Sequence, residues 1–232
     1  MEFFDFLIDN TSALLKEKAV KQFSSFEGNC WKDEGHSGVI LQRDCAYELK
    51  GTGFNLATSR NLSDGIYLYG KDLTEIKKDN SFARITLVSI DAPEDEQKLY
   101  DLVKKIEYVK YHCFPEGFMM RSASDSCKEA VRVSKTALKK GISFQKIGSL
   151  FINKYKEISE VKAVSVIFVT DESVNFNKLT ENARKGAEIT KALNHIMENM
   201  SFDCNSCNLK TLCDEVEGMR ELHFKASGKM GG

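Results

Sequence analysis

The segment Lys162–Thr170, with the sequence KAVSVIFVT, constrains the fold most strongly, because it is apolar on both of its alternating faces. A strand of this kind needs cover on both sides, which is typical of the centre of a sheet between helices. Such a sheet needs a sizeable core, and a chain of 232 residues is long enough for one large domain or two small ones. We therefore expect a central, covered strand in this segment.

Earlier runs rich in β-branched and aromatic residues predict three more strands, at Val39–Leu49, Gly65–Tyr69 and Phe82–Ile90. The segments between them carry Gly, Asn, Ser and Asp, which favour turns. Gly51-Thr52-Gly53 is predicted to be one of these turns and not a dinucleotide-binding loop, because it has no third glycine and opens no helix.

Apolar residues at helical spacing predict helices over residues 2–24, 94–111, 126–140, 145–157 and 176–200. The capping box Ser126-x-x-Glu129 supports the start of the third helix, and Gly141 supports its end. The acidic run at residues 94–96 is predicted to cap the second helix and not to act in catalysis. Because strands cluster early and helices late, we expect an α+β fold with a mixed or antiparallel sheet packed against helices.

The charge balance and hydropathy exclude several classes of protein. The 33 basic and 34 acidic residues give a formal net charge of -1, which provides no overall attraction to nucleic acid. No run of about 18 uncharged apolar residues occurs, so we expect no membrane-spanning helix. The acidic start, Met1–Asp9, lacks the basic region of a secretory signal. We therefore expect a cytoplasmic protein that partners neither nucleic acid nor a membrane.

Three of the seven cysteines lie close together near the carboxyl end, at Cys204, Cys207 and Cys213, and His223 follows them. Two cysteines three residues apart can turn both sulfurs toward one ion, and a third thiolate with an imidazole completes a tetrahedral Cys3His zinc site. The same thiolates could hold an iron–sulfur cluster, which usually has four cysteine ligands. Soft thiolates suit both choices, so the residues leave iron–sulfur and zinc open.

The fourth ligand is open as well. His223 is one candidate, and the others are the remaining cysteines of the chain, Cys30, Cys45, Cys113 and Cys127. The alternative to a metal centre is a loop of unliganded thiols after a helix, with His223 packed beside its apolar neighbours in sequence.

Basic residues are concentrated over residues 128–162, where nine of them stand against three acidic ones. Arg132 and Lys135 share a face of the predicted helix, Arg121 precedes it, and its amino end near Ser126 could accept an anion. A phosphate-bearing ligand or an acidic partner surface would fit this stretch. The alternative is a lysine-rich face that is simply solvated.

Short sequence pieces in a shared order resemble the middle domain of the acetyl-CoA synthase (beta) subunit of the CO dehydrogenase/acetyl-CoA synthase complex. The pieces are Glu116-Gly117, Arg132-Val133-Ser134-Lys135, Lys140-Gly141, Phe144-x-x-Ile147-Gly148 and Phe168-Val169-Thr170-Asp171-Glu172. A weaker likeness extends over residues 43–76, so the resemblance covers about residues 40–213. It implies an α+β domain at 38–200 that leads to a cysteine-rich metal-binding segment at 201–225. The residues themselves predict an N-terminal helix and loop at 1–37 and a Gly-rich, flexible tail at 226–232.

In that family the middle domain leads to a cysteine run that holds a [4Fe-4S] unit. Cys204 and Cys207 resemble its opening pair, Cys213 resembles the third ligand, and His223 falls near the offset of the fourth. The family's nickel-binding Cys-Gly-Cys, most of its catalytic C-terminal domain and its N-terminal docking domain have no counterpart here. The tryptophan that the family links with coenzyme A aligns with Ala130.

The residues and the resemblance are compatible with three functions. The first is a metal-binding accessory or partner-docking protein of one-carbon and acetyl-CoA metabolism, which would dock a corrinoid protein or another protein of the one-carbon pathway. The second is a subunit of a CO-methylating acetyl-CoA synthase, an acyltransferase, that binds coenzyme A through Arg121, Arg132 and Lys135. The third is a structural zinc module without a catalytic role. Without nickel ligands we expect no acetyl-CoA synthesis by this chain alone, and we predict no catalytic residue.

Overall fold

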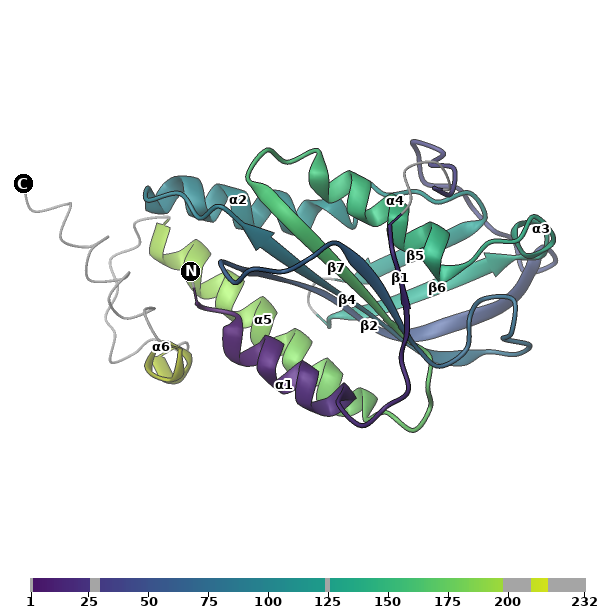
Figure 1. Ribbon diagram of the computed structural model, residues 1–232, viewed down its shortest axis with the longest axis horizontal. Coiled ribbons are helices and arrows are strands. Elements are labelled where there is room, and N and C mark those ends of the chain that lie inside the picture. Colours follow the sequence, from purple (N-terminus) through teal and green to yellow (C-terminus); the bar gives the residue numbers. More distant parts are fainter. Residues whose placement is uncertain (1, 26–29, 124–125, 198–209, 217–232) are drawn as a thin grey trace, which may run out of the picture.

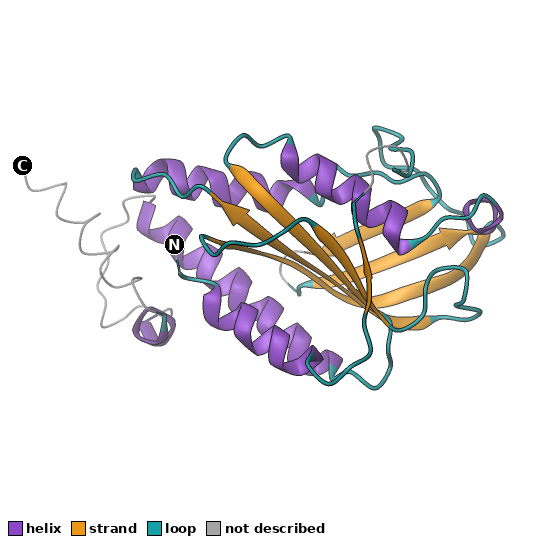
Figure 2. Ribbon diagram, in the orientation of Figure 1, coloured by secondary structure: helices purple, strands orange, loops and turns teal. Residues whose placement is uncertain are grey.

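The fold is a mixed seven-stranded sheet with helices on both faces, shown by a computed structural model that describes residues 2–25, 30–123, 126–197 and 210–216 (Figures 1 and 2). The strand order in these residues is β1-β3-β7-β4-β2-β6-β5. The strands are β1 (Lys21–Phe23), β2 (Cys45–Thr58), β3 (Gly65–Tyr69), β4 (Asn80–Ile90), β5 (Phe118–Ala123), β6 (Lys128–Ser134) and β7 (Val161–Val169). The helices are α1 (Asp5–Leu15), α2 (Glu96–Val109), α3 (Lys135–Lys139), α4 (Phe144–Lys156), α5 (Phe176–Met197) and α6 (Lys210–Glu215). The α+β prediction is confirmed.

The predicted central strand is β7. It lies between β3, to which it is parallel, and β4, to which it is antiparallel. Val164, Val166 and Phe168 are fully buried, and the residues between them are almost as well covered. Burial on both faces is what an apolar run without polar alternation requires.

Helices α1 and α5 cover one face of the sheet, and α4 covers the other. Gly148 of α4 lies against Ile66 of β3, which belongs to the same cross-strand row as Asn55 of β2. Leu56 follows Asn55, so it points to the opposite face, where it lies beside Gly186 of α5. The two faces are therefore covered by different helices, which Figure 1 labels as α1 and α5 on one side and α4 on the other.

Several predicted elements are confirmed with small shifts of their ends. Helix α2 begins at the acidic run, where the Asp95 side chain accepts a hydrogen bond from the Lys98 backbone N–H and so caps the helix. Helix α4 occupies the predicted segment 145–157, capped by Ser143. Helix α5 fills the described part of 176–200. No helix within the described ranges combines the length and apolar character that a membrane span requires.

The helix predicted over residues 126–140 is wrong. Residues 128–134 form β6, and only the five-residue helix α3 follows, capped by Ser134. The alternation of buried Glu129, Val131 and Val133 with more exposed neighbours is the period of a strand. Pairing with β2 on one side and β5 on the other outweighs the local helix signal.

The turn predicted at Gly51-Thr52-Gly53 is also wrong, because these residues lie in the middle of β2. A Cβ atom at Gly51 would lie 1.8 Å from the Phe82 carbonyl oxygen, and one at Gly53 would lie 2.0 Å from a Glu129 carboxylate oxygen. These glycines permit a close approach inside the sheet, which is the other common role of glycine in a strand.

The remaining differences are in the first sixty residues and at β5. The predicted helix over 2–24 ends at Leu15, and residues 21–23 form the edge strand β1. The predicted strand Val39–Leu49 begins only at Cys45 and continues to Thr58, so residues 38–44 form an irregular segment. Strand β5 was not predicted at all. The domain boundaries stay a prediction, and the tail at 226–232 lies outside the described residues.

Candidate functional site

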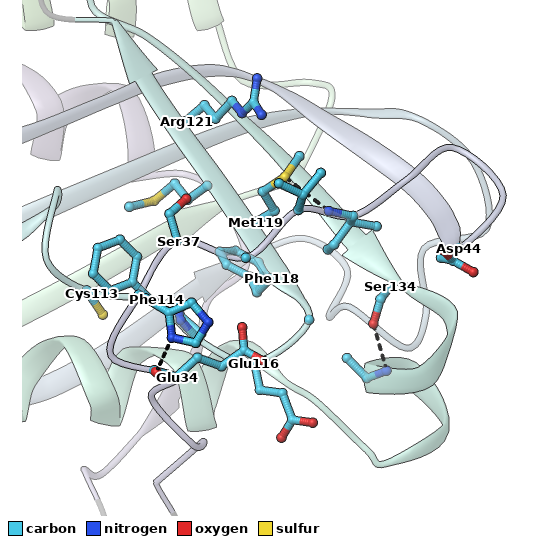
Figure 3. A pocket seen from close by; sticks show the side chains of 18 of the residues that line it. Glu34, Ser37, Asp44, Cys113, Phe114, Glu116, Phe118, Met119, Arg121 and Ser134 are labelled. Carbon is cyan, nitrogen blue, oxygen red and sulfur yellow. Dashed lines mark hydrogen bonds between the residues drawn. The ribbon is translucent and has the colours of Figure 1, made fainter.

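A hollow lies at the β5 edge of the sheet, and we call it the edge hollow (Figure 3). Its volume is about 800 Å³. The segment 34–44 forms one wall, and the residues leading into β5 form the other, with Ser134 at the start of α3 closing one end. A concave site of this size at the edge of a sheet is large enough for an organic ligand or a partner side chain.

Backbone and side-chain hydrogen bonds hold the segment 34–44 beside β5. The Glu34 N–H donates to the Phe114 carbonyl over 2.8 Å, and the Ile40 N–H donates to the Met119 sulfur over 3.3 Å. The carboxylate of Asp33 accepts from the Gly35 and Phe114 backbone N–H groups and pairs with a lysine of α4. The wall is therefore held beside β5 at its start and at Ile40.

The three residues predicted to bind an anion are only partly brought together. In the register of β5 and β6, Met119 faces Arg132 and Arg121 faces Ala130, so both arginines lie on one face of the sheet. Arg121 is exposed and lines the edge hollow, whereas Arg132 and Lys135 are not among the residues that line it.

Arg132 and Lys135 already have partners in the chain. Nε of Arg132 donates to Glu48 over 2.7 Å, and its Nη1 donates to the Ile40 carbonyl over 3.2 Å. Hydrogen bonds from Lys50 and Arg132 hold the pKa of Glu48 below its ordinary value. Nζ of Lys135 donates to the Arg43 carbonyl over 2.8 Å. Of the three, Arg121 alone lines the edge hollow.

A fully buried ion pair lies beneath this region and was not predicted from the sequence. Nε and Nη2 of Arg84 donate to the two carboxylate oxygens of Glu129 over 2.9 and 2.8 Å, and both side chains are 0% exposed. Ser122, which lines the edge hollow, donates to the same carboxylate over 2.8 Å. The remaining guanidinium nitrogen donates to Asn55 and Thr86. These contacts satisfy both charges inside the core.

The predicted metal ligands lie largely outside the described residues. This is true of Cys204, Cys207 and His223, whereas the backbone of Cys213 lies in α6. Within the described ranges, no group of three histidine, cysteine or acidic side chains could hold a metal ion. The other four cysteines, Cys30, Cys45, Cys113 and Cys127, form no disulfide there, and burial raises the pKa of each thiol.

Comparison with known proteins identifies the family. No curated protein gives a significant match to the chain. A family model described as the CO dehydrogenase/acetyl-CoA synthase complex beta subunit matches residues 34–174. The matched span is the middle domain, and it contains the whole edge hollow, the Arg84–Glu129 pair and strands β2 to β7. Because the match covers more than half of its length, the chain belongs to the family of the CO dehydrogenase/acetyl-CoA synthase complex beta subunit.

Proposed function

We propose that the chain is a metal-binding accessory protein of CO dehydrogenase/acetyl-CoA synthase metabolism, built on the middle domain of the beta subunit. The observation that carries this proposal is the family match over residues 34–174, followed in the same chain by the three closely spaced cysteines. The family's nickel motif, Cys-Gly-Cys, does not occur within these 232 residues.

The donor set Cys204, Cys207, Cys213 and His223 fits a metal centre chemically. Three thiolates and one imidazole suit zinc or an iron–sulfur cluster. A cluster would carry single electrons when bound, whereas zinc would be structural. Leu212 and Val216, on either side of Cys213, are buried, and Lys185 of α5 pairs with Glu215 over 3.4 Å. These contacts support a metal segment anchored to the helical layer of the domain.

Anaerobic purification followed by measurement of iron, zinc and acid-labile sulfide tests the metal proposal. We expect either iron with sulfide and broad visible absorption, or one zinc per chain, and loss of the metal in Cys204→Ser and Cys207→Ser. Ser206→Ala is the matched control, because this residue lies between the two cysteines in sequence and is not in the proposed donor set. Metal-free protein of normal stability, or metal retained by both variants, would contradict the proposal.

The partner that we propose is a corrinoid protein or another protein of the one-carbon pathway, within the complex after which the family is described. The uncovered face of β2, β6 and β5 supports this, because it carries Lys50, Lys128, Arg121 and Arg132 against Glu48. A net-positive face favours an acidic partner surface. Binding of the purified corrinoid protein that weakens with salt and with Lys128→Glu would support docking here, and binding unaffected by both would exclude this face.

Coenzyme A is a second candidate ligand, favoured by Arg121 at the wall of the edge hollow. The test is a titration of the purified chain with coenzyme A. Saturable binding that weakens in Arg121→Ala but not in Lys139→Ala, an exposed lysine of α3 outside the hollow, would support it. Absence of binding at millimolar coenzyme A would exclude this candidate ligand.

A further inference from the structure

Strand β5 ends the sheet, and alternate residues along it turn their backbone groups away from the only strand beside it. The Ser134 N–H donates to the Gly117 carbonyl over 2.9 Å, which continues the β5–β6 ladder by one pair. In an antiparallel ladder every second residue bonds to the partner strand. The odd-numbered residues of β5 therefore bond to β6, whereas the backbone groups of Phe118, Met120 and Ser122 point outward.

No strand completes this edge within the described residues. The segment 34–44 runs beside β5, but the one hydrogen bond described between them goes from the Ile40 N–H to the side-chain sulfur of Met119. In the part of the chain that the structure describes, no hydrogen bond reaches the N–H groups of Met120 and Ser122. A row of unpaired backbone groups at a sheet edge is a template on which another chain can pair.

The open edge faces a space and not a packed layer. All residues from Phe118 to Ser122 line the edge hollow, whose volume is about 800 Å³, and Figure 3 shows β5 crossing it with Met119 and Arg121 along the strand. A bound segment that pairs from Phe118 to Ser122 needs about five residues, which span about 17 Å when extended. The hollow lies between β5 and the segment 34–44, where such a segment would have to run.

Apolar side chains are exposed around this edge. Val39 is 70% exposed and Tyr111 is 38% exposed, and both line the hollow. Met119 and Met120 are half-buried, and they point to opposite faces of β5 because successive residues of a strand alternate. Methionine adapts its shape to different neighbours and is common at surfaces that bind peptides. The edge therefore offers apolar contacts on both faces of an added strand.

The charge of the edge favours an acidic residue in that strand. Arg121 is exposed, and among the described residues it forms no ion pair, not even with Glu34, Asp44 and Glu116, the acids that line the same hollow. Opposite charges on neighbouring strands stabilise a sheet. The sequence of β5, FMMRSA, contains no acid, so the β5 strand of a second copy of the chain provides no partner for Arg121.

We propose that the open edge of β5 binds an extended segment of a partner protein as an additional strand. The backbone of that segment pairs with Met120 and Ser122, an acidic residue lies beside Arg121, and apolar residues lie against Met119 and Met120. This is recognition by strand addition, in which main-chain hydrogen bonds give affinity and alternate side chains give specificity. It requires neither a corrinoid protein, nor coenzyme A, nor the metal segment, so each of those proposals can fail without it.

A synthetic peptide tests the edge. The probe is acetyl-Thr-Glu-Val-Val-Thr-amide, which in antiparallel pairing places its glutamate opposite Arg121 and its central valine opposite Met120. Titration of the full chain with this peptide is followed by heteronuclear NMR and by amide hydrogen exchange. We expect saturable binding that slows exchange of the Met120 and Ser122 N–H groups. Exchange of the Arg121 N–H, which already faces β6, is expected to stay unchanged.

Three matched peptides separate the contributions to binding. N-methylation of the central valine blocks an N–H that faces β5, and we expect it to abolish saturable binding. N-methylation of the next valine blocks an N–H that faces away, and we expect binding to persist. A peptide with glutamine in place of glutamate is expected to bind about fivefold more weakly, because it loses the charge opposite Arg121.

Variants of the chain test the location. Met120→Pro removes an outward N–H and leaves the bonds to β6, since proline is tolerated on an edge strand whose N–H faces solvent. We expect it to abolish peptide binding, whereas Met120→Ala, which keeps the N–H, is the matched control and retains saturable binding. Arg121→Glu is expected to weaken the glutamate peptide and to bind a lysine-substituted peptide more tightly than the parent chain does. This charge reversal keeps the test decisive if Met120→Pro fails to fold.

Four results would overturn the proposal. They are absence of saturable binding, equal affinity for the two N-methylated peptides, unchanged binding in a folded Met120→Pro, and unchanged peptide preference in Arg121→Glu. A chain that dimerises with concentration, with slowed exchange at Met120 and Ser122 before any peptide is added, would assign the edge to a second copy and would also overturn it.

Discussion

At the scale of single residues, the most consequential contact is the ion pair of Arg84 and Glu129 in the centre of the sheet. Gly53 leaves the space that the Glu129 carboxylate fills, since a Cβ atom there would lie 2.0 Å from one of its oxygens. The ring of Phe151 lies 5.2 Å from the guanidinium carbon. A pair so completely compensated is stable as a unit, but either partner alone would be an unpaired charge in the core.

The first prediction follows from this arrangement. Arg84→Met is expected to lower the free energy of unfolding by about 3–5 kcal/mol, because Glu129 is left buried and unpaired. Arg84→Met combined with Glu129→Leu is expected to be less destabilised than Arg84→Met alone. Urea denaturation followed by circular dichroism measures both. The control is Arg132→Met, whose side chain is 35% exposed, with an expected loss of no more than about 1 kcal/mol. Equal losses in Arg84→Met and Arg132→Met would contradict the burial argument.

A second prediction concerns acid stability. Hydrogen bonds from Lys50 and Arg132 hold the pKa of Glu48 in the folded chain below its ordinary value of 4.5. The folded state therefore binds fewer protons here than the unfolded state, and the contribution is present above pH 4.5 and lost as the pH falls through the lower folded pKa. Glu48→Gln should flatten the decline of thermal stability over that acidic range, and Glu172→Gln, at an exposed position, serves as the comparison. An unchanged decline in Glu48→Gln would refute the role of this carboxylate.

At the scale of elements, the sequence predicts best where one local pattern decides the structure. The apolar run of β7 and the capped, amphipathic α2 are of this kind. Strand β6 is not, because Glu129 serves equally well in a helical capping box and as the partner of Arg84, which lies 45 positions away. Arg84 itself falls in an alternating strand, where a charged residue suggests a solvent-facing side. The positions of both side chains depend on pairing between residues far apart in the sequence, which no short stretch of the sequence shows.

The third prediction tests how the wall of the edge hollow is held. Asp33→Ala removes the acceptor for the Gly35 and Phe114 N–H groups, at 3.0 and 3.2 Å, together with the pair to Lys154. We expect the backbone N–H of Glu34 and Phe114 to exchange with deuterium faster, while those of β7 keep their protection. Asp44→Ala, which changes another acid at the same hollow, is the control. If the Glu34 N–H of Asp33→Ala exchanges at an unchanged rate, the backbone hydrogen bond from Glu34 to Phe114 is sufficient to fix this segment.

At the scale of the whole molecule, the region that the family model matches lacks the helices that cover one face of its sheet. Helices α1 and α5 lie outside residues 34–174, yet they pack on the face that carries Phe54 and Leu56. Asn182 of α5 donates to Thr11 of α1 over 3.2 Å, which joins the two helices. The predicted candidate sites divide in the same way, because the basic residues belong to the matched domain and the cysteine run follows the covering helix. The sequence could not predict that residues of the two regions line one hollow, where Phe54 of the matched region lies with Ala183 and Ala187 of α5.

The last prediction follows from this division. A fragment of residues 34–174 would expose Phe54 of β2 and Ile85 of β4, on strands that the flanking helices contact in the full chain. Exposed apolar surface of this kind promotes self-association and lowers stability. We expect the fragment to bind a hydrophobic dye and to aggregate on heating, whereas the full chain does neither. The prediction is wrong if the fragment 34–174 is monomeric, does not bind the dye and is as stable as the full chain. The middle domain would then need no cover from its flanking helices.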